Sequence, residues 1–283
     1  MMDARNIESL AERGEFYLCL ARAFLTPHDA LVFDALRDAL ADDLAELGES
    51  LGYACANSVA DYRDAITAIP DHVALLQLYS ALFIAPPRAI QLNTGSYLDG
   101  AINGGSVAAM EDTYRRCGVE RGADFHDLSD HLSVQLEFVA LLYLRNAEAT
   151  ATGTPLPPVR PEHFLHGYVS RWLPAFIRDL EAADAGPNPW LALARVLAAA
   201  VAHDACAEAL PATELRARHA IGKARHDRAE RGVTADDMAF IAQKLREKGL
   251  STDHLAIPPE LRDEAQGYSR GTPPGPRKGS RYE

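Results

Sequence analysis

The chain has 283 residues, of which 48% are hydrophobic, so it is long and apolar enough to bury a sizeable core. Its 28 lysines and arginines stand against 40 aspartates and glutamates, which gives a formal net charge of −12 at pH 7. This composition excludes a chain that is disordered throughout, and the acidic balance argues against a protein that binds nucleic acid through a basic face.

The sequence contains no targeting or membrane feature that we can identify. Four cysteines are scattered without a Cys-x-x-Cys pair, and no apolar segment follows the charged residues at the start. The longest apolar run, 190–202, is interrupted by Arg195 and is shorter than the roughly 20 residues of a membrane-spanning helix. We therefore expect a cytoplasmic protein without disulfides, secretory signal or membrane helix.

Apolar residues recur at intervals of three and four along most of the chain, which is the spacing of amphipathic helices. The first such segment runs from Ile7 to Leu25, before Pro27. Three more are predicted from Phe33 to a stop at Gly48, from Val59 to Pro70, and from Asp71 to Phe83. Further helices are predicted over 105–117, 130–148, 161–183, 189–209, 212–231 and 235–248.

Strand-like alternation and hairpin turns are almost absent, so the predicted fold class is all-α. We expect a single compact helical bundle over residues 1–210 and a helical C-terminal extension over 211–265. Residues 266–283 hold too many proline, glycine and basic residues to pack, and a disordered tail is predicted there.

Two segments stand out as candidate sites. The first is the irregular stretch 84–95, in which Pro86 and Pro87 forbid regular structure. The second, 126–131, reads His-Asp-Leu-Ser-Asp-His just before a predicted helix. Its side chains could hold a metal ion, or Asp130 could simply cap the helix with His131 in the first turn.

Motifs of common enzymes are missing. The sequence has no phosphate-binding loop, dinucleotide fingerprint, zinc-protease motif or nucleophile elbow. We therefore expect no catalytic residues. A helical metal-binding or nucleotide-hydrolysing protein that uses 126–131 is the alternative.

Five segments, in this order, resemble motifs of the TorD/DmsD/NarJ family, the chaperones that mature molybdenum-containing redox enzymes. They are Leu-Tyr-Ser-Ala-Leu-Phe-Ile-Ala-Pro at 78–86, Ser-Tyr-Leu-Asp-Gly at 96–100, Tyr-Arg-Arg-Cys-Gly at 114–118, Asp-His-Leu-Ser-Val-Gln-Leu-Glu-Phe at 130–138 and Trp-Leu-Pro-Ala-Phe at 172–176. Each motif alone is weak, but five in the right order are specific. The resemblance covers about residues 8–205.

This resemblance implies a TorD-like helical bundle and a cytoplasmic, non-enzymatic chaperone. Such a protein binds the N-terminal, twin-arginine-type signal of a molybdoenzyme catalytic subunit of the dimethyl-sulfoxide-reductase superfamily. It assists folding and insertion of the molybdenum cofactor before export or assembly. The implied protein binds no cofactor permanently, meets the molybdenum cofactor only through its client, neither binds nucleic acid nor inserts into a membrane, and is a monomer or a homodimer.

A signal of this kind needs an apolar groove for its helical face and carboxylates for its arginines. Asp130 and His131 are expected at a helix N-terminus beside the 84–97 loop, as part of this signal-binding site. The full set of expected client-binding residues is Tyr79, Leu82, Phe83, Pro86, Pro87, Tyr97, Asp99, Asp130, His131 and Glu137. The aromatic residues Trp172, Phe176 and Trp190 are expected to fill the core instead.

Overall fold

The computed structural model of the chain describes residues 2–85, 90–102, 104–120, 128–183 and 186–205, all within one compact unit. The helices are α1 (Met2–Ala23), α2 (Ala30–Asp38), α3 (Leu40–Ser50), α4 (Ala56–Thr67), α5 (His72–Tyr79), α6 (Thr94–Leu98), α7 (Gly105–Arg116), α8 (Leu132–Thr152), α9 (Pro161–Phe164), α10 (Ser170–Ala182) and α11 (Pro189–Asp204), with π-helical turns η1 (Ser80–Ile84) and η2 (Leu165–Val169). Apart from an isolated β-bridge between Asn93 and His131, regular structure in the described ranges is helical, so the all-α prediction is confirmed. The predicted extension over 211–265 and tail over 266–283 lie outside the described residues.

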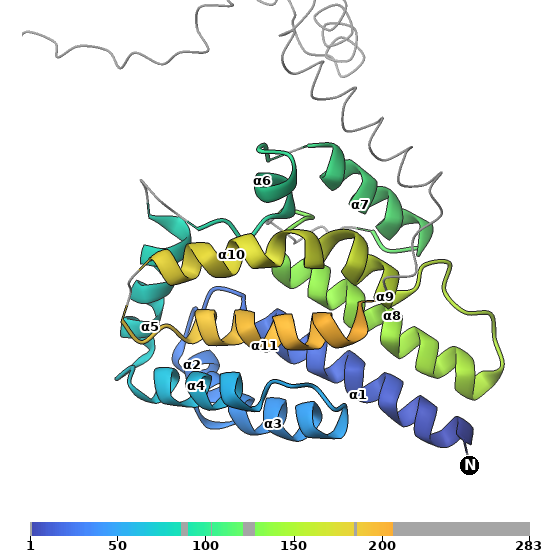
Figure 1. Cartoon of the computed structure of the whole chain (residues 1–283), viewed down its shortest axis with the longest axis horizontal. Coiled ribbons are helices and arrows are strands. Elements are labelled where there is room, and N and C mark those ends of the chain that lie inside the picture. The colour runs from blue at the N-terminus through green and yellow to red at the C-terminus, as the bar shows by residue number, and fades with distance from the viewer. Residues whose placement is uncertain (1, 86–89, 103, 121–127, 184–185, 206–283) are drawn as a thin grey trace, which may run out of the picture. The chain divides into compact units, whose positions relative to one another are not determined.

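The two longest helices, α1 and α8, pack side by side and antiparallel in the centre of the bundle (Figure 1). Gly14 of α1 faces α8, where an added Cβ would lie 2.8 Å from Leu144 Cγ. The missing side chain therefore lets the two backbones approach closely. On one side of this pair α11 packs against α4 and α10, and α10 in turn contacts α6, which packs on α7 (Figure 1).

Several helix ends follow from local capping residues. Asp29 and Asp71 accept hydrogen bonds from the backbone N–H groups of Val32 and Ala74, at 2.9 and 2.8 Å, and so start α2 and α5. Gly153 stops α8 with a φ of +69°, a left-handed conformation that glycine adopts without strain.

The predicted helix from Phe33 to Gly48 is wrong in one respect, because the structure divides it at Ala39 into α2 and α3. The Tyr62 hydroxyl donates a hydrogen bond of 2.7 Å to the Leu36 carbonyl, the group that Leu40 N–H would use in a continuous helix. The stop predicted at Gly48 is also wrong, since Gly48 is buried inside α3. Four helices rather than three therefore precede residue 71.

Two other predicted segments are more complex in the structure. The predicted helix over 161–183 contains the π-helical turn η2, and the helix that begins at residue 72 continues as η1. The short helix α6 includes residues 94 and 95, the end of the stretch 84–95 for which irregular structure is predicted, so that prediction is wrong for these two residues. Residues beyond 205 of the predicted helix over 189–209 are outside the described ranges.

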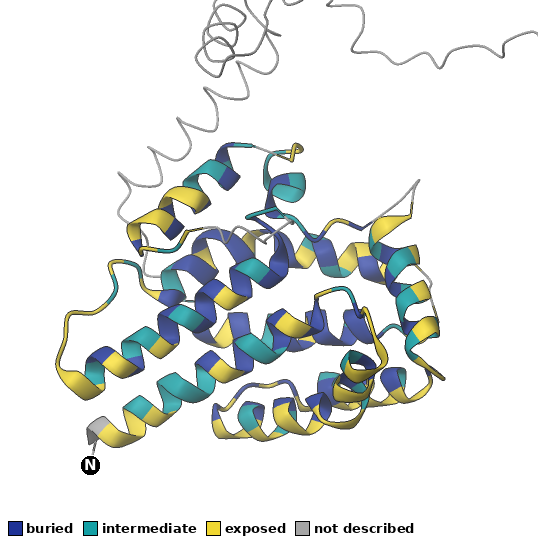
Figure 2. Ribbon diagram, turned by 180° about the vertical axis from the view of Figure 1, so that it is seen from behind, coloured by how far each residue is buried: buried dark blue, intermediate teal, exposed yellow. Residues whose placement is uncertain are grey.

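Aromatic rings form the core between α1, α5, α10 and α11. Trp172, Phe176 and Trp190 are at most 1% exposed, which confirms their predicted core role. The Trp190 indole donates to the Ala23 carbonyl at 3.1 Å and therefore ties α11 to the end of α1. Figure 2 shows the buried residues gathered on the helix faces that turn toward one another.

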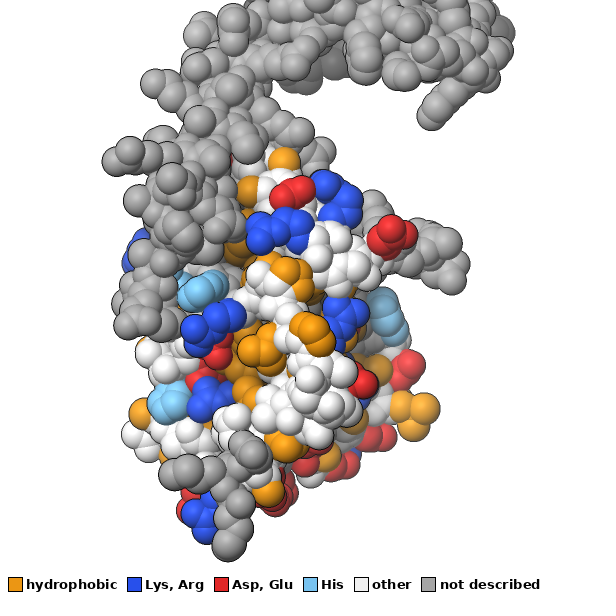
Figure 3. Space-filling model, turned by 90° about the vertical axis from the view of Figure 1, so that its right-hand side faces the viewer, with side chains coloured by type: hydrophobic (Ala, Val, Ile, Leu, Met, Phe, Trp, Pro, Cys, Tyr) orange, Lys and Arg blue, Asp and Glu red, His pale blue; other side chains and the backbone are white. Residues whose placement is uncertain are grey.

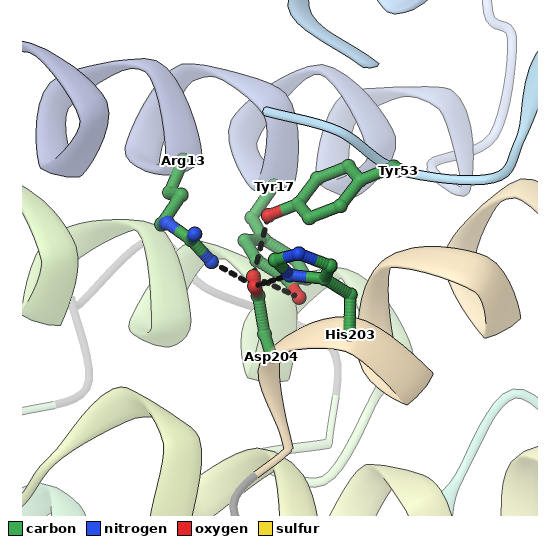
Figure 4. Close-up of polar contacts among 5 residues, drawn as sticks. All are labelled: Arg13, Tyr17, Tyr53, His203 and Asp204. Carbon is green, nitrogen blue, oxygen red and sulfur yellow. Dashed lines mark hydrogen bonds and ion pairs between the residues drawn. The ribbon is translucent and has the colours of Figure 1, made fainter. Parts of the chain in front are cut away.

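A buried carboxylate holds the end of α11 to the start of the bundle (Figure 4). Asp204 is paired with Arg13 of α1, and its Oδ2 accepts a hydrogen bond of 3.0 Å from the Tyr17 hydroxyl and another from Tyr53. His203 Nδ1 lies 3.0 Å from the other carboxylate oxygen. Because the Asp204 side chain is fully buried, these donors take the place of water around its charge.

Alkaline pH should destabilise this fold, because buried tyrosines hold their protons more tightly in the folded than in the unfolded state. Burial raises the pKa of Tyr62. The pKa of Tyr114 is raised well above the ordinary 10.0, first by burial and then by the nearby Tyr168 and Asp130. The unfolded chain then loses its phenolic protons first. The free energy of unfolding should thus be steady below about pH 9 and fall above about pH 10, by up to about 1.4 kcal/mol per pH unit and tyrosine.

Urea unfolding at about pH 8 and about pH 11, together with tyrosinate absorbance, would measure this effect. No lysine precedes residue 223, so lysine titration adds nothing in residues 1–222. Burial also raises the pKa of Cys55 and Cys117. Their titration therefore also lowers the free energy of unfolding, and this loss begins about one pH unit below that of the tyrosines. Full titration of all tyrosines near pH 10 in a protein that stays helical would contradict the prediction.

In the described part of the chain, no single helix is long and apolar enough to cross a membrane. Only α4 taken together with α5 and η1 meets the criteria of length and composition, and that pair is bent by 116°.

Candidate functional site

The start of α8 and the segment that leads into α6 are joined through Asp130. Its carboxylate, which is fully buried, accepts hydrogen bonds from Gly95 N–H at 2.8 Å and from Asn93 Nδ2 at 3.1 Å. Its backbone carbonyl accepts from the side chain of Gln135 at 2.7 Å. We call this set of contacts the α6–α8 junction. It confirms the expectation that Asp130 and His131 lie at a helix N-terminus beside the 84–97 segment.

One backbone contact and one side-chain contact close the junction further. Leu132 N–H donates to the Leu92 carbonyl at 2.7 Å, and Thr94 Oγ1 donates to Gln135 Oε1 at 3.0 Å. Gly95 leaves no room for a side chain, because a Cβ there would lie 2.6 Å from the Ala101 carbonyl oxygen and 3.2 Å from Asp130 Oδ2. The glycine is therefore required for the close approach between α6 and the carboxylate.

His131, not Asp130, is the N-cap of α8. Its Nδ1 accepts a hydrogen bond of 3.2 Å from Ser133 N–H, so Nδ1 carries no proton and the neutral ring holds its proton on Nε2. The alternative in which Asp130 caps this helix and His131 sits in its first turn is wrong. The Asp130 carboxylate instead binds across to α6, which a sequence pattern that covers one helix cannot reveal.

The helix that ends in η1 carries three of the predicted apolar residues. Tyr79 and Leu82 are 3% and 4% exposed, so they belong to the core and support the surface from beneath rather than line an open groove. Phe83 is partly buried against Tyr79 and Trp190, at centroid distances of 4.9 and 5.6 Å. Ile84, which is not among the expected client-binding residues, is 59% exposed at the end of η1. Pro86 and Pro87 lie outside the described residues.

Tyr97 of α6 lies flat on the side chain of Trp172, with centroids 5.2 Å apart and an interplanar angle of 17°. Its hydroxyl donates a hydrogen bond of 2.8 Å to Oδ2 of Asp179 on α10. Burial and then this carboxylate raise the pKa of Tyr97, which keeps the phenol protonated as a donor. Tyr97 thus bridges α6 and α10.

The two remaining predicted carboxylates have different surroundings. Asp99 Oδ2 accepts hydrogen bonds from the backbone N–H of Ser106, at 3.0 Å, and from its hydroxyl, so its charge stabilises the first turn of α7. Glu137 is largely exposed on α8, but its carboxyl is partly shielded from water. This shielding raises its pKa, and the charge of Arg22 on α1 opposes the rise. Neither residue belongs to the α6–α8 junction.

Figure 3 views the side of the bundle where α1 begins and α8 ends, and it shows apolar side chains interleaved with charged side chains of both signs. The charges on this face therefore neither select nor repel an arginine-rich segment. Phe83 and Ile84 lie on η1 and Tyr97 lies on α6. The rings of Phe83 and Tyr97 both lie against Phe176 of α10, with centroids 6.4 Å away.

Of the alternative site at 126–131, His126 and Asp127 lie outside the described residues. Among the residues that the structure does describe, no group of three or more histidine, cysteine, aspartate or glutamate side chains could hold a metal ion. Asp130 and His131 are instead used in hydrogen bonds within the chain.

The sequence matches a known protein family. A family model described as "Nitrate reductase delta subunit" matches residues 33–178, more than half of the chain. The match includes the segment from α5 to α6, the α6–α8 junction and most of α10. No curated protein matches the sequence.

Proposed function

The chain belongs to the nitrate reductase delta subunit family, a family of molybdoenzyme maturation chaperones, and from this membership we propose its specific task. It binds the N-terminal signal of a molybdoenzyme catalytic subunit in the cytoplasm. It then holds the subunit until the molybdenum cofactor is inserted, and it meets that cofactor only through its client. The observation that carries this proposal is the family match over residues 33–178, because the match includes η1, α6, the start of α8 and most of α10, the elements that carry the candidate surface formed by Phe83, Ile84 and Tyr97.

The chemistry of the surface fits such a ligand. A twin-arginine-type signal combines a basic pair with an apolar, helix-forming segment. The apolar side chains of that segment, spaced at i, i+3 and i+4, fit into an apolar groove of the receptor. The exposed side chain of Ile84 and the partly buried Phe83 and Tyr97 supply apolar and aromatic area. The net charge of −12 favours encounter with a basic peptide.

We assign different roles to the residues expected at this site. Phe83 and Tyr97, with Pro86 and Pro87 of the adjoining segment, contact the client, while Tyr79 and Leu82 support them from the core. Asp130 and His131 position α6 and the start of α8 through the hydrogen bonds described above. Asp99 and Glu137 add negative charge to the chain that attracts a basic signal.

The test is binding of the purified chain to a molybdoenzyme catalytic subunit from the same genome, produced without molybdenum cofactor. We expect a stable complex in size-exclusion chromatography that is lost when the N-terminal signal of the subunit is removed. Loading the subunit with cofactor should also weaken the complex.

The control is the same subunit truncated by an equal number of residues at its C-terminus, which should still bind. Equal binding of the intact subunit and the subunit without its signal would reject signal recognition. No complex with any molybdoenzyme subunit of that genome would reject the proposed function as a whole.

A further inference from the structure

The carboxylate of Asp179 is placed differently from the other carboxylates around the candidate surface. It is exposed on α10, and Tyr97 Oη donates to its Oδ2 at 2.8 Å. Within the described ranges its Oδ1 accepts no hydrogen bond, and no arginine or histidine forms an ion pair with it. Asp179 therefore presents a negative charge that the described part of the chain does not neutralise.

Three other carboxylates on or beside these elements are already engaged. Asp130 is fully buried in the α6–α8 junction, and Asp99 binds the first turn of α7. Glu181, two residues beyond Asp179, forms an ion pair of 3.0 Å with Arg195 of α11. An incoming cation would have to break one of these contacts, whereas Asp179 can accept it directly.

Aromatic rings stand beside this carboxylate. Tyr97 is stacked on Trp172, and Phe176 meets the two rings edge-on at 6.4 and 5.5 Å. The Trp172 indole is 1% exposed, and its Nε1–H has no acceptor among the described residues. A buried donor without an acceptor is unfavourable, so a ligand carbonyl that reached this N–H would gain a hydrogen bond.

We propose that Asp179 and Tyr97 form the subsite that receives an arginine side chain of the client signal, an assignment that rests on the proposed function. A guanidinium is planar, so it can stack against the phenol ring while two of its N–H groups bind the carboxylate in bidentate fashion. The Tyr97 hydroxyl occupies one oxygen in the free protein and holds the carboxylate in place. Sequence motifs do not point to Asp179, because it lies just beyond the Trp-x-x-x-Phe segment at 172–176.

The test uses two synthetic peptides, one with an Arg-Arg pair followed by an apolar helix-forming segment and one with Gln-Gln in place of the pair. Isothermal calorimetry at low salt should show that the wild-type chain prefers the Arg-Arg peptide. Asp179→Asn should reduce this preference by about fivefold, the effect of losing one largely exposed ion pair, and leave the Gln-Gln peptide unaffected. Asp179→Glu should restore part of the preference.

The matched control is Asp61→Asn, which removes the same charge from an exposed position on α4 and should leave the preference unchanged. If Asp179→Asn keeps the full preference for the Arg-Arg peptide, or if Asp61→Asn lowers it equally, the subsite assignment is wrong. Failure of the wild-type chain to bind either peptide or the intact client subunit would instead reject the proposed function. The two failures are therefore distinguishable.

Discussion

Replacing Asp204 with alanine is expected to lower the free energy of unfolding by about 3–5 kcal/mol. The substitution leaves the guanidinium of Arg13 partly buried, with 21% of its side chain exposed, and without its counter-charge. It also leaves the hydroxyls of Tyr17 and Tyr53 without their acceptor. Breaking a buried pair costs more than the pair contributes, because the desolvated partner remains.

The same carboxylate connects parts of the chain that are far apart in sequence. Arg13 and Tyr17 belong to α1, Tyr53 follows α3, and Asp204 ends α11 (Figure 4). Two rings also flank the Arg13 guanidinium, those of Tyr53 and Tyr143, with centroids 5.9 and 6.0 Å away. Loss of Asp204 should therefore loosen the packing of α11 on α1 as well as reduce the overall stability.

Urea unfolding followed by circular dichroism would measure the loss. Asp204→Asn keeps the shape and one acceptor oxygen, so it should cost less, about 1–3 kcal/mol. Glu181→Gln is the matched control, because its ion pair with Arg195 also anchors α11 but is exposed, and it should cost less than about 1 kcal/mol. Similar losses for Asp204→Ala and Glu181→Gln would show that the buried network contributes nothing beyond a surface ion pair.

Much of the fold follows from apolar periodicity, since the pattern reflects which helix face is buried. It does not report where a helix breaks when both halves bury their faces against the same core. The division at Ala39 is of this kind, because its cause is the Tyr62 hydroxyl on another helix. The π-helical turns η1 and η2 are only five residues long each, too short for a pattern averaged over several helical turns to reveal.

The candidate site was only partly predictable for a related reason. The order of motifs located the α6–α8 junction, and the pairing of the 84–97 segment with Asp130 and His131 is confirmed. The partners of Asp130 and the placement of Asp179 depend on contacts between residues 35 and 82 positions apart. The Arg13–Asp204 pair spans 191 positions, and neither residue stands in a motif.

Replacing Asp130 with alanine should lower the free energy of unfolding by about 2–4 kcal/mol, because two donors lose their acceptor. The Gly95 N–H and the Asn93 amide are held only by this carboxylate among the described side chains. Gly95 is buried, so its N–H has no water to replace the carboxylate, whereas Asn93 is only partly buried. Each buried donor left unsatisfied costs about 1–3 kcal/mol. Gly95→Ala should disturb the same junction by about 1–3 kcal/mol, because its Cβ meets the Ala101 carbonyl.

Asp130→Asn separates the charge of this residue from its hydrogen bonds. The asparagine oxygen can still accept from Gly95 N–H, and a flipped Asn93 amide can accept from the new side-chain NH2, so the loss should be at most about 1 kcal/mol. Urea unfolding and peptide calorimetry on the same samples would test both points. If Asp130 only positions α6, Asp130→Asn will retain the preference for an Arg-Arg peptide that Asp179→Asn loses. A stable Asp130→Asn protein without that preference would instead mean that the junction opens and Asp130 binds the arginine itself.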